Sequence, residues 1–276
     1  MRTLPTPQEI LALRKQVYAH FEAHGRVLPW RSSPTPYGVF VSEVMLQQTQ
    51  VDRVVGYFSR FTTALPSFAT LAEAPLATVL SLWQGLGYNR RAVNVRAAAI
   101  MVMTEFGGEL PNTETDLVRL PGIGTATAGS IAAFGFNSPT VFLETNIRAV
   151  LIHHFFANKA TVDDSELLPI AEALLDKENP FRWYSAVMDY GSVLKKMVGN
   201  AAQKSSGYKK QSTFAGSKRQ LRGAVLRFVL LNTTATSTML KKEFADRLSD
   251  LPEVLVQLTN ENILTKRRST YSIAHD

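Results

Sequence analysis

The sequence has 276 residues, of which 45% are hydrophobic and 19% charged, with 16 Gly and 13 Pro. A chain of this length can bury a core as one large or two modest domains, which excludes a collagen-like, low-complexity or disulfide-stapled protein. It contains no cysteine. Its own residues therefore cannot form a disulfide, a thiolate zinc site or an iron–sulfur cluster.

The chain is basic, with 30 Lys and Arg against 23 Asp and Glu and a net charge of +7. This charge favours a polyanionic partner, either nucleic acid or an acidic membrane surface. No run approaches 18 apolar residues, and Pro5, Pro7 and Glu9 lie where the apolar part of a signal peptide would fall. We expect a soluble cytoplasmic protein, nucleoid-associated if bacterial, without a membrane partner.

Apolar residues recur at spacings of three and four through most of the first 198 residues, beginning with Ile10, Leu13, Val17 and Phe21. This spacing predicts amphipathic helices. Further stretches of the same kind cover residues 39–58, 75–83, 91–105, 125–134, 146–156, 166–176 and 181–198. Prolines separate several of them, and Gly107 with Gly108 predicts a helix end. The pattern predicts an all-α body with short connections.

The composition changes at about residue 199, where Gly, Ser, Gln and Lys replace large apolar residues. Residues 195–222 include eight basic residues and no acidic one, namely Lys195, Lys196, Lys204, Lys209, Lys210, Lys218, Arg219 and Arg222. We interpret residues 199–217 as a basic linker. The pattern leaves open whether this linker contacts phosphate or is a solvated tether.

The last segment predicts helices over residues 218–231, 239–248 and 252–261, with a Thr/Ser turn after the first. The final residues alternate around Arg267 and Arg268, which predicts a β-hairpin with a basic turn. Three short helices closed by a basic hairpin resemble a winged helix, a module that binds DNA in some proteins and protein in others. The expected domains are therefore 1–198, the linker 199–217, and a winged-helix-like module over 218–276.

Residues 120–129, with the sequence LPGIGTATAG, follow one predicted helix and open another. Gly122 and Gly124 allow a tight turn whose N–H groups can approach an anion, while Ile123 can pack into the core. The helix that begins near Thr125 would direct its positive end at that anion. The alternative is a glycine-rich turn between helices without a ligand.

Together with PWR at 29–31, SEVMLQQTQV at 42–51 and LWQGLGY at 82–88, this hairpin resembles the helix-hairpin-helix DNA glycosylases. The resemblance covers about residues 10–198 and is greatest to the MutY family of adenine glycosylases. It implies two helical lobes around a cleft. It also implies double-stranded DNA with a mispaired or damaged base as the partner, bound by a monomer.

In this family the glutamate of SEVMLQQ protonates the leaving base, so the resemblance assigns Glu43 as the general acid. Its apolar neighbours are expected to raise its pKa. The alternative is a capping or salt-bridging glutamate. The resemblance further places Gln47 and Gln48 against the opposite strand and makes Tyr88 the wedge that unstacks a base, although Tyr88 could instead be a core residue.

The same resemblance implies DNA contacts for Arg31 and for the hairpin residues Gly122, Ile123, Gly124 and Thr125. The family carries a second carboxylate, an aspartate, about twenty residues after the hairpin. Here the matching residue is Glu144, which is one methylene longer. We assign Glu144 as the anion that stabilises the sugar cation and Asn146 as a residue that contacts DNA. Capping of the following helix is kept as the alternative role of Glu144.

Two further departures from the family shape the expectation. Position 126, where endonuclease III carries its Schiff-base lysine, is alanine, which predicts a monofunctional enzyme. The four cysteines of the family's cluster are missing, and the basic linker, including Lys209 and Lys210, is expected to supply phosphate contacts in their place. The C-terminal region, at about 55 residues, is too short for the family's 8-oxoguanine-recognition domain.

Two remaining side chains have structural roles in this interpretation. Asp189 is expected to form an ion pair or to pack between helices, and the resemblance leaves open a role on the sugar side of the pocket. His153 and His154 are adjacent on a helix, so both cannot face one metal ion, and no metal site is expected.

We therefore expect an all-α helix-hairpin-helix glycosylase fold with a small C-terminal α/β module. The expected activity is removal of adenine opposite 8-oxoguanine or guanine. No cofactor is expected, and a monovalent cation at the hairpin is left open. Two alternatives remain, namely a mismatch thymine or uracil glycosylase on the same scaffold and a non-catalytic DNA-damage-binding protein.

Overall fold

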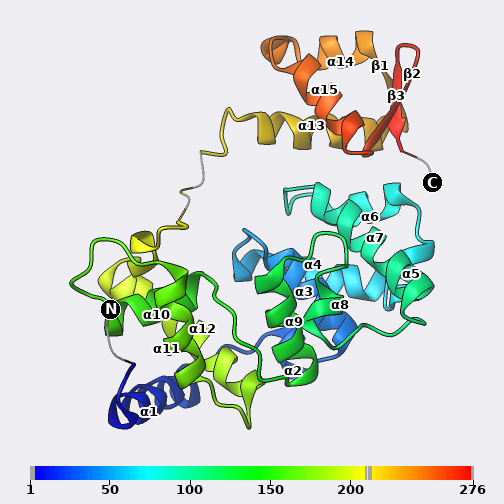
Figure 1. Cartoon of the computed structure of the whole chain (residues 1–276). Helices are drawn as coiled ribbons and strands as arrows, with labels where there is room; N and C mark the ends of the chain where they lie inside the picture. Colours follow the sequence, from blue (N-terminus) through cyan, green and yellow to red (C-terminus); the bar gives the residue numbers. More distant parts are fainter. Residues whose placement is uncertain (1–3, 209, 211–212, 275–276) are drawn as a thin grey trace. The chain divides into compact units, whose positions relative to one another are not determined.

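The computed structural model describes residues 4–208, 210 and 213–274 (Figure 1). The chain divides into two compact units, each assembled from separate segments. One unit takes in the chain up to Glu43, Asn112–Arg119 and Ile123–Lys210. The other takes in Val44–Pro111, Leu120–Gly122 and the chain after residue 210. The chain therefore passes from one unit to the other and back within the hairpin turn, since Leu120–Gly122 belong to the second unit and the residues on either side belong to the first.

The first unit is helical. It contains α1 (Pro7–His24), α2 (Pro29–Ser32), most of α3 (Pro36–Leu46), α8 (Glu114–Leu117), α9 (Thr125–Phe136), α10 (Thr145–Phe155), α11 (Asp164–Leu174) and α12 (Pro180–Val198). Its core is a single apolar cluster built mainly from α1 and α9 to α12. At Gly191 of α12, an added Cβ would lie 2.6 Å from the carbonyl oxygen of Asn146, so α12 packs closely on the beginning of α10.

The segment after α12 remains attached to this unit. A short 3₁₀ helix, η1 (Ala201–Lys204), packs against α10. Val162 N donates to Lys204 O at 2.9 Å, and Lys204 Nζ donates to Ala157 O at 2.6 Å. The first part of the predicted linker is therefore folded, and hydrogen bonds hold it in place.

The second unit begins with α4 (Val51–Ala64), α5 (Phe68–Glu73), α6 (Leu76–Trp83) and α7 (Arg90–Glu105). Helix α4 is strongly amphipathic and buries Val54, Phe58 and Phe61. Phe61 meets Trp83 of α6 edge-on, with ring centroids 5.7 Å apart. Helix α7 ends before Gly107 and Gly108, whose φ angles of 63° and 87° confirm the predicted helix end.

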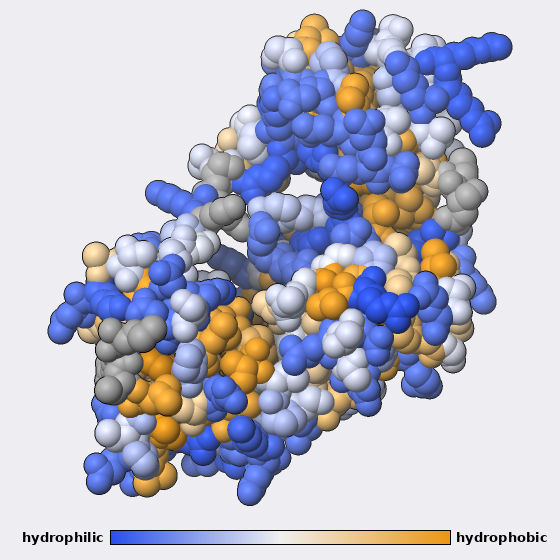
Figure 2. Space-filling view, in the orientation of Figure 1, coloured by the Kyte–Doolittle hydropathy of each residue, from blue (hydrophilic) through white to orange (hydrophobic). Residues whose placement is uncertain are grey.

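The C-terminal module is α13 (Lys218–Asn232), β1 (Thr234–Thr236), α14 (Ser237–Glu243), η2 (Ala245–Arg247), α15 (Leu251–Asn260), β2 (Leu264–Arg267) and β3 (Thr270–Ile273). Among the described residues its strands form one antiparallel sheet in the order β1-β3-β2. The predicted hairpin is confirmed, with its turn at Arg268 and Ser269. On the face shown in Figure 2, hydrophilic residues cover most of this module.

The structure corrects three expectations. The helix predicted over residues 39–58 is interrupted, because α3 ends at Leu46 and α4 begins at Val51. The Thr/Ser turn after α13 contains the strand β1, which obtains its hydrogen bonds from β3. The helix predicted over residues 239–248 is shorter, since α14 ends at Glu243 and a 3₁₀ turn follows. The domain boundaries 1–198, 199–217 and 218–276 remain a proposal.

Within the described residues, no helix has the length and apolar character needed to cross a membrane. The same residues include no group of three His, Cys, Asp or Glu side chains arranged to hold a metal ion.

Candidate active site

Glu43 lies on α3, next to the buried apolar residues Val44 and Met45. Ser130 Oγ donates a hydrogen bond of 2.6 Å to Glu43 Oε2 from α9. Burial raises the pKa of Glu43 to about 7; the Ser130 hydrogen bond and the charge of Arg31 oppose the rise, and the negative charge of Glu144 adds to it. Glu43 therefore holds a proton near neutral pH and lies within electrostatic reach of the second carboxylate.

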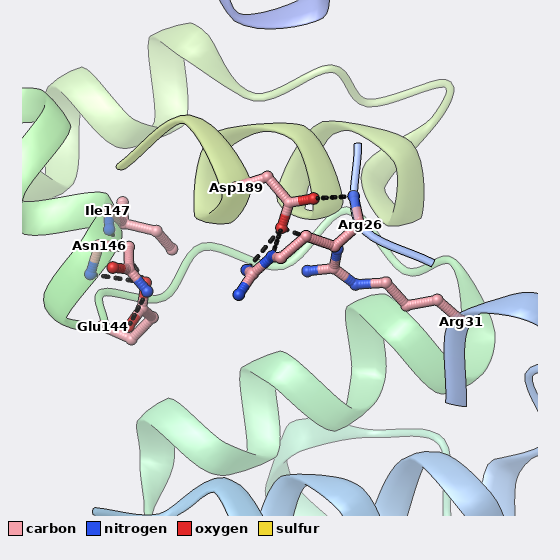
Figure 3. A network of polar contacts seen from close by, with 6 residues as sticks. All are labelled: Arg26, Arg31, Glu144, Asn146, Ile147 and Asp189. Atoms are coloured by element: carbon pink, nitrogen blue, oxygen red, sulfur yellow. Dashed lines mark hydrogen bonds and ion pairs between the residues drawn. The ribbon is translucent and has the colours of Figure 1, made fainter. Parts of the chain in front are cut away.

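Glu144 is the N-cap of α10, and its side chain turns back onto that helix (Figure 3). Glu144 Oε1 accepts hydrogen bonds from Asn146 N at 2.7 Å and from Ile147 N at 3.1 Å. The capping role kept as an alternative is thus the role seen in the structure, and it presents the carboxylate at the positive end of a helix dipole.

Burial also raises the pKa of Glu144, while the two backbone N–H groups and the charge of Lys195 oppose this rise. Glu43, in contrast, receives one hydrogen bond within the described part of the chain, from a hydroxyl. Because hydrogen bonds to an ionised carboxylate favour its charged form, Glu144 has the environment better suited to the anion. The two buried carboxyls therefore differ in their hydrogen-bond donors, and both have a pKa raised by burial.

Asn146 stands beside Glu144, and its Nδ2 lies 3.4 Å from Glu144 Oε2. The Oδ1 atom of Asn146 is buried and has no hydrogen-bond partner within the described part of the chain. A buried acceptor without a partner costs free energy, so it marks a place where a water or ligand donor is expected.

Asp189 of α12 is 2% exposed and binds two arginines (Figure 3). Its Oδ1 accepts from Arg26 Nη2 at 2.6 Å and from Arg31 Nη1 at 2.9 Å, and its Oδ2 accepts from Arg26 N at 2.8 Å. The ion pair predicted for Asp189 is confirmed. Arg31, assigned to DNA, is nearly buried here and paired with Asp189, so in this structure it acts on Glu43 through its charge.

The hairpin turn has the geometry that its glycines predict. Gly122 has a φ of 81°, and an added Cβ would lie 2.6 Å from Asn94 Nδ2, so no larger residue fits without a shift. Ile123 is buried, as expected, while Gly124 and Thr125 are exposed at the beginning of α9.

The residues assigned to the opposite strand and to the wedge lie near one another in the second unit. Gln47 Nε2 donates to Gly122 O at 3.2 Å, which joins the loop after α3 to the hairpin turn. Gln48 is exposed, and Tyr88 is 36% exposed. Arg219 of α13 lies over the Tyr88 ring, 5.4 Å from its centroid, and donates to its hydroxyl.

The linker lysines expected to contact phosphate lie only partly within the described residues. Lys210 is exposed, and Lys209 lies outside the described residues. Lys195 is half-buried near Glu144, and Lys204 binds a backbone carbonyl. Lys204 therefore has a structural partner in the folded part of the linker, and the phosphate contacts of the linker remain a prediction.

Sequence reasoning missed several residues that the structure places around the carboxylates. Ser130 is the one hydroxyl residue in the run Ala126–Ala133 besides Thr127, and its polarity within an alanine-rich helix was the available signal. Arg26, and Lys195 as a neighbour of Glu144, gave no such signal, because their partners are remote in the sequence.

Residues 41–171 match the model of the HhH-GPD superfamily of base excision DNA repair proteins. The chain therefore carries a helix-hairpin-helix domain of this superfamily. It is, more specifically, a homologue of the adenine DNA glycosylases. It is 37% identical over 178 residues to the adenine DNA glycosylase of Buchnera aphidicola subsp. Baizongia pistaciae, covering 64% of this chain and 50% of the relative.

Two further relatives bear the same name. The Mus musculus adenine DNA glycosylase is 35% identical over 198 residues, covering 67% of this chain and 38% of the mouse protein. The Mycolicibacterium smegmatis protein is 29% identical over 226 residues, covering 76% of this chain and 77% of that protein. The matched region is thus half or less of the length of the Buchnera and mouse relatives.

Solved structures confirm the fold. A thermostable thymine-DNA glycosylase superposes with a TM-score of 0.60 at 19% identity, covering 67% of this chain and 87% of that structure. Endonuclease III from a non-covalent DNA complex superposes with a TM-score of 0.57 at 18% identity, covering 67% of this chain and 85% of that structure. The predicted helix-hairpin-helix glycosylase fold is therefore confirmed.

Proposed function

We propose that the chain is a DNA glycosylase of base excision repair that hydrolyses adenine from a mispair with 8-oxoguanine or guanine. The observation that carries the proposal is the carboxylate pair, in which Glu43 has a pKa of about 7 and Glu144 caps α10 within its electrostatic reach. The name shared by the similar relatives, adenine DNA glycosylase, supports the choice of base.

In this mechanism the flipped adenine enters the site and accepts the proton of Glu43 on a ring nitrogen. Protonation lets the C1′–N bond break with its electron pair on the base, which leaves an oxocarbenium ion on the sugar. The Glu144 carboxylate stabilises that cation. Water then adds to C1′ and gives up a proton to the Glu43 carboxylate, which the first step left ionised. We assign the orientation of this water to Asn146, whose Oδ1 is buried and has no partner within the described residues.

The remaining parts of the machinery act on the duplex. Gln47 and Gln48 contact the opposite strand, and Tyr88 fills the stack beside the extruded base. The hairpin residues Gly122, Ile123, Gly124 and Thr125 bind the phosphate backbone through main-chain N–H groups at the start of α9. The partner is double-stranded DNA, bound by a monomer.

We further propose that the reaction ends at an abasic site. Ala126 occupies the position of the lyase lysine, so no amine is present there to form a Schiff base. Lys195 is the amine near Glu144, and burial lowers its pKa. Borohydride trapping on an abasic duplex tests this point. We expect no covalent complex, and a complex lost in Lys195→Arg would instead assign lyase activity to that residue.

The proposal requires no cofactor. An iron–sulfur cluster of the kind found in many relatives needs four thiolates, and these 276 residues contain none. In the corresponding part of the chain, η1 is held by backbone hydrogen bonds and Lys204. The donor set does not fit the cluster, and no step depends on it.

The test is a panel of duplexes with adenine, thymine or uracil opposite each base and opposite 8-oxoguanine, treated with alkali after incubation. We expect cleavage at adenine opposite 8-oxoguanine or guanine, abolished in Glu43→Gln with DNA binding retained. Cleavage confined to thymine or uracil would support the mismatch alternative. Binding without cleavage of any duplex would support a non-catalytic protein.

A further inference from the structure

Arg91, in the first turn of α7, has a buried guanidinium that binds two separate loops. The side chain is part of a residue only 7% exposed. Its Nη1 donates to the carbonyl oxygens of Val44 at 3.0 Å, Met45 at 2.6 Å and Gln47 at 2.7 Å. Its Nη2 donates to Thr49 Oγ1 at 3.0 Å and to the carbonyl oxygens of Leu86 at 3.4 Å and Gly87 at 3.1 Å. One side chain thus joins the end of α3 to the loop before α7.

Each of these loops contains a residue with a left-handed backbone. Gln48 has a φ of 56° and Tyr88 a φ of 50°. Neither is glycine, so each conformation costs free energy and persists only where the surroundings hold it. The carbonyl directly before each residue, that of Gln47 and that of Gly87, accepts from Arg91. The same guanidinium therefore fixes two peptide groups, one directly before each left-handed residue.

We infer that Arg91 is a positioning residue that holds Gln48 and Tyr88 together in the conformations in which they meet the duplex. This inference rests on the proposed function. In it, the Arg91 side chain couples the contact of Gln48 with the opposite strand to the unstacking of a base by Tyr88. Arg91 itself is buried and does not touch DNA.

The chemistry of this position requires arginine. The last carbonyls of α3 lack helical partners and form the negative end of its dipole, where a cation is stabilising. A guanidinium presents several donors in a planar fork and can serve two loops at once, whereas an ammonium is a compact point charge. The Arg91 guanidinium also lies 5.5 Å from the Trp83 ring and 5.6 Å from the Tyr88 ring, which adds cation–π contact to the wedge itself.

Arg96 provides a matched control on the same helix. It is 8% exposed, and its Nε donates to Ala74 O at 2.6 Å, outside both loops. The experiment compares Arg91→Lys with Arg96→Lys. Base release is measured in a single turnover at saturating protein, on adenine opposite guanine. Base extrusion is measured in a Glu43→Gln background, by the fluorescence of 2-aminopurine in place of the adenine.

We expect Arg91→Lys to slow base release at least tenfold, since a shift of about 1 Å in a positioned group can cost on the order of a hundredfold. We also expect it to reduce the fluorescence rise at least threefold. Arg96→Lys should change neither quantity more than twofold. Affinity for undamaged duplex should stay within twofold in both, because phosphate contacts are unchanged.

Equal behaviour of the two variants in both measurements would overturn the inference. A parent protein that releases no base would instead contradict the proposed function, so the two failures are distinguishable. If Arg91→Lys does not fold, Thr49→Val removes one acceptor of the Arg91 fork. Its control is Thr62→Val, whose hydroxyl donates to Phe58 O. We then expect a threefold or greater loss of extrusion in Thr49→Val alone, and equal extrusion in both threonine variants would overturn the inference.

Discussion

The Ser130 hydroxyl lies 2.6 Å from Glu43 Oε2, and Glu144 lies close enough to raise the pKa of the same glutamate. Glu43 is thus held between a neutral donor and a second carboxylate. Burial, with a smaller contribution from the charge of Glu144, raises the pKa of Glu43 to about 7, whereas the Ser130 hydrogen bond favours the ionised form. The ionised form of Glu43 is therefore costly to the fold.

Replacement of Glu43 by Gln should stabilise the protein at high pH. The pKa of Glu43 is raised in the folded state, so its contribution to stability is present below pH 4.5 and is lost as the pH rises through about 7. Glutamine is neutral and can still accept from Ser130. The advantage of Glu43→Gln in free energy of unfolding should therefore grow by about 3 kcal/mol between pH 4.5 and pH 7 in urea titrations. A pH-independent difference would contradict the raised pKa.

Two substitutions of Glu144 separate its capping role from its charge. Glu144→Ala removes the acceptor for Asn146 N and Ile147 N and should cost about 1 kcal/mol of stability, whereas Glu144→Gln keeps an acceptor oxygen and should cost less. Both should slow single-turnover base release about a hundredfold or more, because the anion is lost. A parental rate in Glu144→Gln would leave Glu144 as a helix cap only.

Loss of the buried carboxylate at Asp189 should destabilise the fold. Asp189→Asn leaves the guanidiniums of Arg26 and Arg31 without a counter-charge, which should cost about 3 kcal/mol in chemical denaturation. The control is Glu22→Gln, which removes an exposed pair with Arg182 and should cost less than about 1 kcal/mol. Equal effects would mean that the Asp189 cluster is as weakly coupled as a surface pair.

The basic turn of the C-terminal hairpin should contact DNA phosphates. Arg267 and Arg268 are exposed, whereas α15, from Leu251 to Asn260, has no Lys or Arg. Replacement of both arginines by Ser should lower the slope of log affinity against log salt by about 2, since each phosphate contact releases about one counterion. Lys15→Ser, on α1, should leave the slope unchanged. An unchanged slope in the double variant would point to a protein partner for this module.

Much of the helical fold could be predicted, because amphipathic spacing and Gly or Pro boundaries are local signals. The predicted helix over 91–105 is α7, and the one over 181–198 is α12. The break between α3 and α4 was not predicted, because residues 47–50 (QQTQ) contain neither Gly nor Pro to mark a helix end. That break depends on Gln48 adopting a left-handed backbone beside the carbonyls held by Arg91.

The carboxylates of the site could be located from motifs, but their surroundings could not. Ser130 is 87 residues from Glu43, and their contact exists only once α9 packs near α3. Strand β1 is hidden for the same reason, because its three residues pair with a strand 36 residues later, as Ala235 does with Tyr271. Local signals therefore locate Glu43 and Glu144, whereas the packing of remote segments determines the burial and the contacts that shift the pKa of Glu43.

The pH dependence of single-turnover base release tests the central claim, that Glu43 delivers the proton to the leaving base. On adenine opposite guanine, the rate should be near its maximum below pH 7 and fall about tenfold per pH unit above it, as the Glu43 carboxyl ionises. A rate that stays constant from pH 6 to pH 9 in the parent protein, or base release that persists in Glu43→Gln, would contradict the account.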